Sequence, residues 1–339
     1  MLDAIVLQFL NGLDKGGAYS LIALGLTLVF GTLGIVNFAH GALFMLGAFC
    51  AVGMQRLLTL STQVKDESIK FFEAFKEVPY LESWFGDVGR TIIDYSVPLS
   101  ILLAIPIMLL VGLVMERGLV RFFYKRSHAE QILVTFGLAI VLQEIIKILF
   151  GANPIPVSAP PPVAGSADIG AWFGLGAGVV YPWWRLIYFG FAMVIIALVF
   201  AFLRFTTYGM VVRAGMRDRD TVGLLGINIQ RRFTVVFGLA AVVAGLAGVM
   251  YTPIVPPSYS MGMDFLVLSF VVVVVGGMGS LAGAVLAGFL LGILQSFASM
   301  NEINSLFPGI DQIIIYLVAV IVLLVRPRGL MGRVGVMES

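Results

Sequence analysis

Long apolar runs, separated by short polar segments, make up most of the sequence. A helix needs about 20 mainly apolar residues to cross the hydrocarbon layer of a bilayer, so most of these runs can span a membrane. The pattern predicts an all-α polytopic membrane protein with about eight or nine membrane segments, one of them short. The runs are Gly16–Phe30, Ile35–Leu57, Val97–Met115, Ile132–Phe150, Leu186–Leu203, Phe233–Tyr251, Phe265–Val275, Leu281–Phe297 and Ile310–Val325.

The beginning of the chain leaves two interpretations open. Met1–Leu13 carries Asp3 and no cation, which argues against a cleavable secretory signal because such a signal begins with positive charge. Asp14 and Lys15 then interrupt the apolar pattern. We therefore expect Met1–Leu13 either to lie on the membrane surface as a helix or to belong to the first span.

The composition agrees with a membrane protein. Hydrophobic residues make up 60% of the 339 residues and charged residues 12%, about half the charged fraction of a typical soluble domain. Cys50 is the single cysteine, which excludes an intrachain disulfide. We expect one transmembrane domain over residues 1–339.

The Lys and Arg residues gather in three of the connecting segments. The segments 116–131, 204–232 and 326–339 hold 13 of the 21 cations. By the positive-inside rule, short loops rich in Lys and Arg stay in the cytoplasm. The loop 61–95 instead holds seven carboxylates against four cations, and the loop 151–184 holds no cation. We therefore expect 204–232 and the tail 326–339 to be cytoplasmic, and the two other loops to lie on the opposite side.

Both outer loops carry aromatic residues that suggest contact with the membrane surface. In the loop 61–95, the spacing of four apolar residues predicts a short amphipathic helix. In the loop 151–184, a proline-rich stretch predicts an extended connector, and three aromatic residues fit an interfacial belt. The first set is Phe71, Phe72, Phe75 and Val78, and the second is Tyr181, Trp183 and Trp184.

Two glycine-rich breaks interrupt the apolar runs. Because Phe233–Tyr251 runs outward and Ile310–Val325 runs inward, Phe265–Phe297 must enter and return as a hairpin. Its first arm of about 11 residues reaches only ~17 Å, so the turn lies partly inside the membrane, where protein or a water-filled cavity has to cover it. A similar break near the start fits an internal repeat, or chance glycine-rich packing. The breaks contain Gly276, Gly277 and Gly279, and Gly31, Thr32 and Gly34.

Polar side chains inside the apolar runs are the main candidates for function. Asn37 and His40 are three residues apart, so we expect them to share a helix face. Polar groups in a membrane segment face the bundle interior and are functional candidates by default, although a packing hydrogen bond between helices is the alternative. Glu144 and Lys147 have the same spacing, which predicts a neutralising pair near the outer end.

The loop 204–232 combines positive charge with apolar side chains. Its spacing predicts one or two short helices on the cytoplasmic face, with a helix stop at Gly226 and Asn228. Leu224 and Leu225 would expose apolar surface to water, which favours a partner protein that covers them. The alternative is a basic connector held against anionic membrane lipid.

The sequence lacks residues that several classes of activity require. The sequence contains no GxxxxGK[ST] motif to bind ATP phosphates. Its two histidines are too few to build a metal site alone. We therefore expect no enzyme activity, no catalytic residue, no cofactor, no metal site and no nucleic-acid partner.

Several motifs lie in order over nearly the whole chain. They are Ala18-Tyr19-Ser20-Leu21-Ile22-Ala23-Leu24-Gly25, Gly31-Thr32-Leu33-Gly34-Ile35-Val36-Asn37-Phe38-Ala39-His40-Gly41, Thr135-Phe136-Gly137-Leu138, Leu224-Leu225-Gly226-Ile227-Asn228, Gly276-Gly277-Met278-Gly279-Ser280 and Arg326-Pro327-Arg328-Gly329-Leu330. Together they resemble the motifs of branched-chain amino acid ABC permeases. One departure, Ala42 in place of a frequent acidic residue, leaves the substrate open.

The resemblance implies a set of site residues. It implies an ABC importer permease fold with glycine-broken hairpins and a cytoplasmic coupling helix that contacts the ATPase. The expected substrate path contains Gly31, Thr32, Gly34, Asn37, His40, Gly276, Gly277 and Gly279. The expected coupling residues are Arg213, Arg217, Asp218, Leu224, Leu225, Gly226 and Asn228.

The resemblance also implies partners and a location. A second homologous permease, two ATP-binding subunits and a periplasmic binding protein would complete an importer in the bacterial inner membrane. The expected substrate is a branched-chain or other small amino acid, with urea or short amides as the near alternative. An ion-coupled secondary transporter acting alone and a passive channel are alternatives from other classes.

Overall fold

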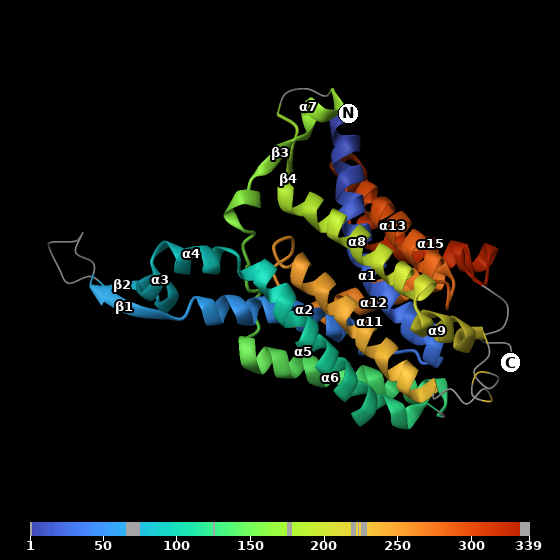
Figure 1. Ribbon diagram of the computed structural model, residues 1–339. Helices are drawn as coiled ribbons and strands as arrows, with labels where there is room; N and C mark the ends of the chain where they lie inside the picture. Colours follow the sequence, from blue (N-terminus) through green and yellow to red (C-terminus); the bar gives the residue numbers. More distant parts are fainter. Residues whose placement is uncertain are drawn as a thin grey trace.

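The computed structural model describes residues 2–65, 75–124, 126–174, 178–217, 222, 224 and 229–332 (Figure 1). Within these residues, each of the nine apolar runs lies wholly or mostly in a helix, and the predicted all-α polytopic fold is confirmed. Seven helices are long and apolar enough to cross a membrane, and two apolar helices, α12 and α15, are shorter. The nine are α1 (Leu2–Leu33), α2 (His40–Leu58), α5 (Ser96–Gly118), α6 (His128–Phe150), α8 (Trp183–Phe205), α11 (Ile229–Tyr251), α12 (Met261–Gly276), α13 (Leu281–Ala298) and α15 (Ile310–Val325).

Short elements fill the connections between these helices. Two small antiparallel hairpins, β1–β2 and β3–β4, lie in the two acidic loops. The helix α9 lies in the basic loop 204–232. The short elements are β1 (Ser61–Lys65), β2 (Phe75–Pro79), α3 (Tyr80–Phe85), α4 (Asp87–Asp94), η1 (Val120–Phe123), η2 (Pro161–Val163), β3 (Ser166–Asp168), α7 (Ile169–Phe173), β4 (Val180–Pro182), α9 (Thr207–Arg217) and α14 (Asn301–Asn304).

The amphipathic helix predicted around Phe75 and Val78 is wrong for the described part of that segment. These residues belong to strand β2, which pairs with β1 in the register Ser61↔Pro79 and Lys65↔Phe75. Main-chain hydrogen bonds to a neighbouring strand override the local apolar spacing here. Phe71 and Phe72 lie outside the described residues.

Helix α1 forms the centre of the bundle and packs closely against α13. The residues of α1 from Gly16 to Phe30 are buried. A Cβ atom added to Gly292 of α13 would lie 2.4 Å from the backbone nitrogen of Gly16, so the two backbones are in contact. Small residues allow such close packing between membrane helices. Helices α11, α12, α8 and α2 also contact α1.

The first helix is continuous through Asp14 and Lys15, so the start of the chain extends the first predicted span rather than forming a separate surface helix. Asp14 is buried, and its Oδ2 lies 3.1 Å from Nη1 of Arg185 on α8. The hydroxyl of Tyr181 donates a 3.1 Å hydrogen bond to the same oxygen. An opposite charge and a hydrogen bond therefore compensate for burial of this carboxylate.

The predicted aromatic belt is only partly correct. Tyr181 and Trp184 are buried, because Tyr181 binds Asp14 and the Trp184 Nε1 donates a 3.0 Å hydrogen bond to the Met250 carbonyl. Trp183 is exposed and packs against Trp172, with 5.7 Å between ring centroids. Polar atoms on the two buried rings find partners inside the bundle rather than at the membrane surface.

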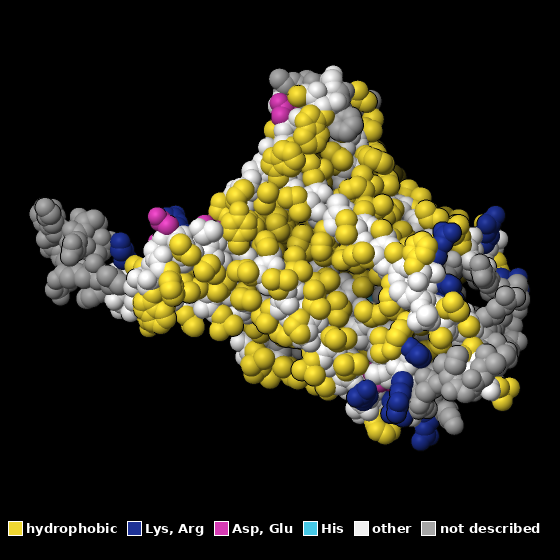
Figure 2. Space-filling model, viewed as in Figure 1, with side chains coloured by type: hydrophobic (Ala, Val, Ile, Leu, Met, Phe, Trp, Pro, Cys, Tyr) yellow, Lys and Arg dark blue, Asp and Glu magenta, His cyan; other side chains and the backbone are white. Residues whose placement is uncertain are grey.

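The segments predicted to be basic and cytoplasmic come together at one end of the bundle, which we call the basic end. It contains η1, α9, the start of α11 and residues 326–332. Figure 2 shows Lys and Arg side chains gathered there. The Thr234 hydroxyl on α11 donates a 2.9 Å hydrogen bond to Glu116 on α5, which joins two of the segments. At the opposite end, the β3–β4 hairpin packs against Val6, Leu7 and Leu10 of α1.

Candidate substrate path and coupling surface

The two glycine-rich breaks lie next to each other. The first connects α1 to α2 through residues 34–39, and the second connects α12 to α13 through residues 277–280. A Cβ atom added to Gly279 would lie 4.0 Å from the Cα of Gly31. The structure therefore brings together two segments that are about 250 residues apart in sequence.

The α1–α2 connector runs back into the bundle along α12. Gly31 lies beside the end of the α12 hairpin, the Phe38 ring contacts Phe270 with 5.3 Å between centroids, and Gly41 packs on the Gly262 carbonyl. From Gly31 to Gly41, the chain therefore contacts α12 first near its last turn and finally near its first turn, about 20 Å apart along the helix axis. Residues 34–39 are non-helical backbone inside the bundle, which a membrane tolerates only where protein or a cavity covers it.

Asn37 does not share a helix face with His40, and that prediction is wrong. Asn37 precedes α2, and its Oδ1 accepts a 3.0 Å hydrogen bond from the backbone N–H of Ala39. The backbone carbonyl of Asn37 accepts a 3.2 Å hydrogen bond from the backbone N–H of His40. Asparagine competes with helical hydrogen bonding in this way and favours turns. The Phe38 N–H donates to Oγ1 of Thr135 on α6 at 3.0 Å, which fixes the connector.

His40 is the first residue of α2 and is fully buried against α1. A Cβ atom on Gly25 would come within 2.5 Å of its Nε2, so only glycine leaves room for the imidazole. Among the described residues, Nδ2 of Asn37 has no hydrogen-bond partner. The His40 imidazole has at most one, the backbone of Ile22, so at least one of its two ring nitrogens is unpaired. A buried polar atom left unpaired costs about 1 to 3 kcal/mol. Both side chains therefore carry unused hydrogen-bonding capacity in this conformation.

The α12–α13 turn is held by the segment that follows α15. The N–H groups of Leu330 and Met331 donate to the carbonyls of Val275 and Gly276 at 2.8 and 3.0 Å. Gly277 and Gly279 have φ values of 101° and 83°, which favour glycine. These contacts give the predicted glycines a clear packing role, because Gly276 also touches the backbone of Gly283 on α13.

The remaining predicted path residues lie at the first break. Thr32 is buried, and its hydroxyl donates a 2.6 Å hydrogen bond to the Leu28 carbonyl. Gly34 has φ 63°, which ends α1 in a left-handed conformation. Gly31 and Gly34 are half-buried. The structure thus gathers Gly31, Thr32 and Gly34 beside the second break, with Asn37 and His40 deeper in the bundle.

The described part of the loop 204–232 contains the short helix α9, in agreement with the one or two short helices predicted there. Val212 of α9 is fully buried against Leu203 and Val236, whereas Arg213 is exposed. Leu224 is 87% exposed. Arg217 ends α9. The other predicted coupling residues, Asp218, Leu225, Gly226 and Asn228, lie outside the described residues.

Glu116 is a buried residue that the sequence pattern did not identify. It lies near the end of α5, is fully buried, and accepts hydrogen bonds from the hydroxyls of Tyr124 and Thr234. These bonds join α5, the α5–α6 connector and α11 close to α9. Its position beside Arg117 at the end of an apolar run resembled an ordinary solvated loop start, so only the fold shows its burial.

Two ion pairs involve side chains of the apolar helices. The predicted pair of Glu144 and Lys147 is confirmed, with 3.3 Å between Oε2 and Nζ, and Lys147 also lies over the Tyr259 ring. Asp14 and Arg185 form a second pair. In the part of the chain that the structure describes, no group of three His, Cys, Asp or Glu side chains could hold a metal ion.

Comparisons with known proteins identify the family. The family described as branched-chain amino acid transport system / permease component matches residues 8–323. The high-affinity branched-chain amino acid transport system permease protein LivH of Salmonella typhimurium is 27% identical over 331 residues, 96% of this chain and 95% of that protein. The corresponding protein BraD of Pseudomonas aeruginosa is 28% identical over 335 residues, with the same two shares.

A more distant relative comes from a sugar system. The ribose import permease protein RbsC of Haemophilus influenzae is 23% identical over 235 residues, which cover 67% of this chain and 69% of that protein. No solved structure matches the chain. Because the family match covers nearly all of the apolar helices and both glycine-rich breaks, the chain belongs to the branched-chain amino acid transport permease family.

Proposed function

We propose that this chain forms one half of the substrate path of an ABC importer for branched-chain amino acids. The observation that carries the proposal is the similarity to two such permeases over 96% of the chain, together with helices over all nine apolar runs. Its partners are then a second permease, two ATP-binding subunits and a periplasmic binding protein. The complex lies in the bacterial inner membrane.

The charge distribution supports the orientation. The basic end, with α9 and residues 326–332, faces the cytoplasm by the positive-inside rule. The acidic loops 61–95 and 151–184 then face the periplasm, where the binding protein docks. Helix α9 and the exposed Leu224 form the surface that meets an ATP-binding subunit.

Asn37 and His40 belong to the substrate path in its open state. Both are fully buried here and retain unpaired nitrogen atoms. The adjacent breaks at 34–39 and 277–280 are the places where the bundle can rearrange with the fewest helical hydrogen bonds lost. In the open state, the unpaired nitrogens gain water or the carboxylate of the passing amino acid as partners, which favours opening in the presence of substrate.

Uptake assays test this assignment. In vesicles containing the complete complex, His40→Ala and Asn37→Ala should each lower ATP-driven leucine uptake at least tenfold, or about 1.4 kcal/mol of barrier. The control is Cys50→Ser, also on α2 but outside the break. Thermal stability and co-purification of the ATP-binding subunits report assembly. Normal uptake in both variants would place the path elsewhere, and failed assembly of both would show that the residues serve packing alone.

The same vesicles separate the alternatives. A secondary transporter or a passive channel would move substrate without ATP, so loss of uptake on removal of ATP excludes both. Competition of labelled leucine by excess isoleucine, valine, urea or ribose then identifies the substrate class. Only the first two amino acids should compete under the proposal.

A further inference from the structure

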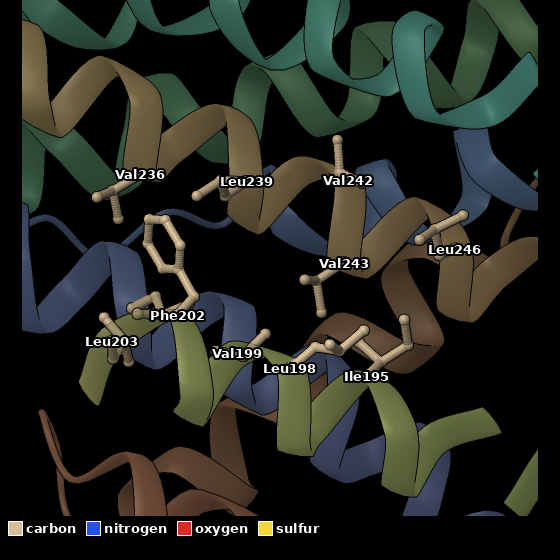
Figure 3. Close-up of a pocket in the computed structure, with 11 residues that line it drawn as sticks. Ile195, Leu198, Val199, Phe202, Leu203, Val236, Leu239, Val242, Val243 and Leu246 are labelled. Carbon is tan, nitrogen blue, oxygen red and sulfur yellow. The ribbon is translucent and has the colours of Figure 1, made fainter. Parts of the chain in front are cut away.

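An apolar groove lies between α8 and α11 (Figure 3). Its volume is about 220 Å³, and all of its lining side chains are apolar. Figure 3 shows Val199 and Phe202 of α8 facing Val236, Leu239 and Val243 of α11 across the gap. An engineered apolar cavity of about 150 Å³ stays dry and binds benzene. The groove therefore has the chemistry and the size to hold a segment of a hydrocarbon chain.

The groove opens toward the membrane. Helix α8 packs mainly on α1, while α11 lies between α2, α1 and α5, so α8 and α11 diverge and leave a gap above Leu28 of α1. Leu198 at the rim is 58% exposed. Because both helices have the length and hydropathy of membrane spans, an occupant enters from the hydrocarbon phase.

One end of the groove carries a positive charge. Arg232, Val236, Leu239, Val243 and Leu246 follow at i, i+4, i+7, i+11 and i+14, so Arg232 lies on the same stripe of α11 as the groove lining. The carbon at the centre of its guanidinium lies 4.0 Å from the centroid of the Tyr208 ring, on α9.

This contact fixes the position of the charge. Helix α9 follows α8 directly after Thr206, so the Arg232–Tyr208 contact crosses the basic end of the groove. Arg232 forms no salt bridge with any residue that the structure describes. Arg204, in the last turn of α8, places a second exposed cation at this end.

We propose that the groove binds a segment of one acyl chain of an anionic phospholipid, whose phosphate group Arg232 binds. An apolar channel with a cation at one end matches the two parts of such a lipid. A guanidinium suits phosphate because its planar donors match the phosphate oxygens. Basic pockets between membrane helices on the cytoplasmic side bind anionic head groups in this way. Val212 of α9 packs against Leu203 and Val236, and these two residues also line the groove.

Native mass spectrometry of the purified transporter complex tests the proposal after extensive detergent washing. The wild type should retain phosphatidylglycerol in preference to phosphatidylcholine. Leu239→Trp, which fills the groove, should lower retention at least tenfold. Arg232→Gln should lower the preference for phosphatidylglycerol at least threefold. The matched controls are Leu317→Trp on the exposed face of α15 and Arg117→Gln at the end of α5, and both should behave as the wild type.

Other results would overturn the proposal. Equal retention in Leu239→Trp and Leu317→Trp would show that the lipid lies outside the groove, and unchanged head-group preference in Arg232→Gln would remove the phosphate contact. If Leu239→Trp does not fold, Arg232→Gln alone decides the result. A photoreactive residue at position 198 that crosslinks to the second permease rather than to phospholipid would make the groove a protein interface.

Discussion

At the scale of single residues, burial decides how much an ion pair contributes. The side chain of Asp14 is 2% exposed and that of Arg185 32%, whereas Glu144 and Lys147 are 47% and 41% exposed. Removing the partner of a buried charge costs about 3 to 5 kcal/mol, and exposed pairs contribute about 1 kcal/mol or less.

We expect Arg185→Leu to lower the thermal stability of the purified protein strongly, because Asp14 stays buried and unpaired. Asp14→Asn should cost less, since Arg185 reaches water and Asn still accepts from Tyr181, and the matched control Lys147→Leu should cost least. Equal losses for the three variants would contradict this account.

At the scale of elements, α9 and the described residues that follow it, Val222 and Leu224, include both buried and exposed apolar side chains. Val212 and Val222 are buried, whereas Leu224 is 87% exposed, so Leu224→Asp should leave the isolated chain folded. If an ATP-binding subunit covers this side chain, the introduced carboxylate becomes buried and unpaired, which costs several kcal/mol at the contact. We expect Leu224→Asp to lower ATP-driven uptake at least tenfold with normal insertion. Leu306→Asp, 74% exposed and outside this loop, is the control and should transport normally. Wild-type uptake by Leu224→Asp would remove this surface from the coupling mechanism.

At the scale of the whole molecule, the start of α1 and residues 326–332 lie on opposite sides, because nine apolar helices connect them. The start of α1 packs against the β3–β4 hairpin, so the N-terminus lies with the acidic loops. In a Cys50→Ala background, cysteines at Leu2, Ser83 and Ser166 should react with an impermeant thiol reagent added to intact cells. A cysteine at Thr207 on α9 should react only after the membrane is permeabilised. This topology would be contradicted if the cysteine at position 207 reacted in intact cells, or if the cysteine at position 2 did not react.

Local properties of the chain were enough to predict much of this structure. The apolar runs marked the membrane helices because a bilayer demands about 20 apolar residues in sequence. Gly34, Gly277 and Gly279 marked the breaks because their positive φ values are ones that few other residues adopt. Glu144 and Lys147 paired as expected because both lie on one helix. The candidate path residues came from these local signals together with the family resemblance, and their role in transport stays a prediction.

Contacts between distant segments determined the features that local patterns did not predict. The sequence placed Asn37 on a helix face, but its side chain closes a turn that Thr135 of α6 fixes from 97 positions away. Strand β2 replaced a predicted helix because β1 pairs with it, and Tyr181 left the membrane surface because Asp14 lies within hydrogen-bond distance. The side of the N-terminus, the burial of Glu116 and the meeting of Gly31 with Gly279 likewise depend on packing between distant segments. Periodicity along one chain reports which residues are apolar, whereas only the tertiary structure determines which segments supply their partners.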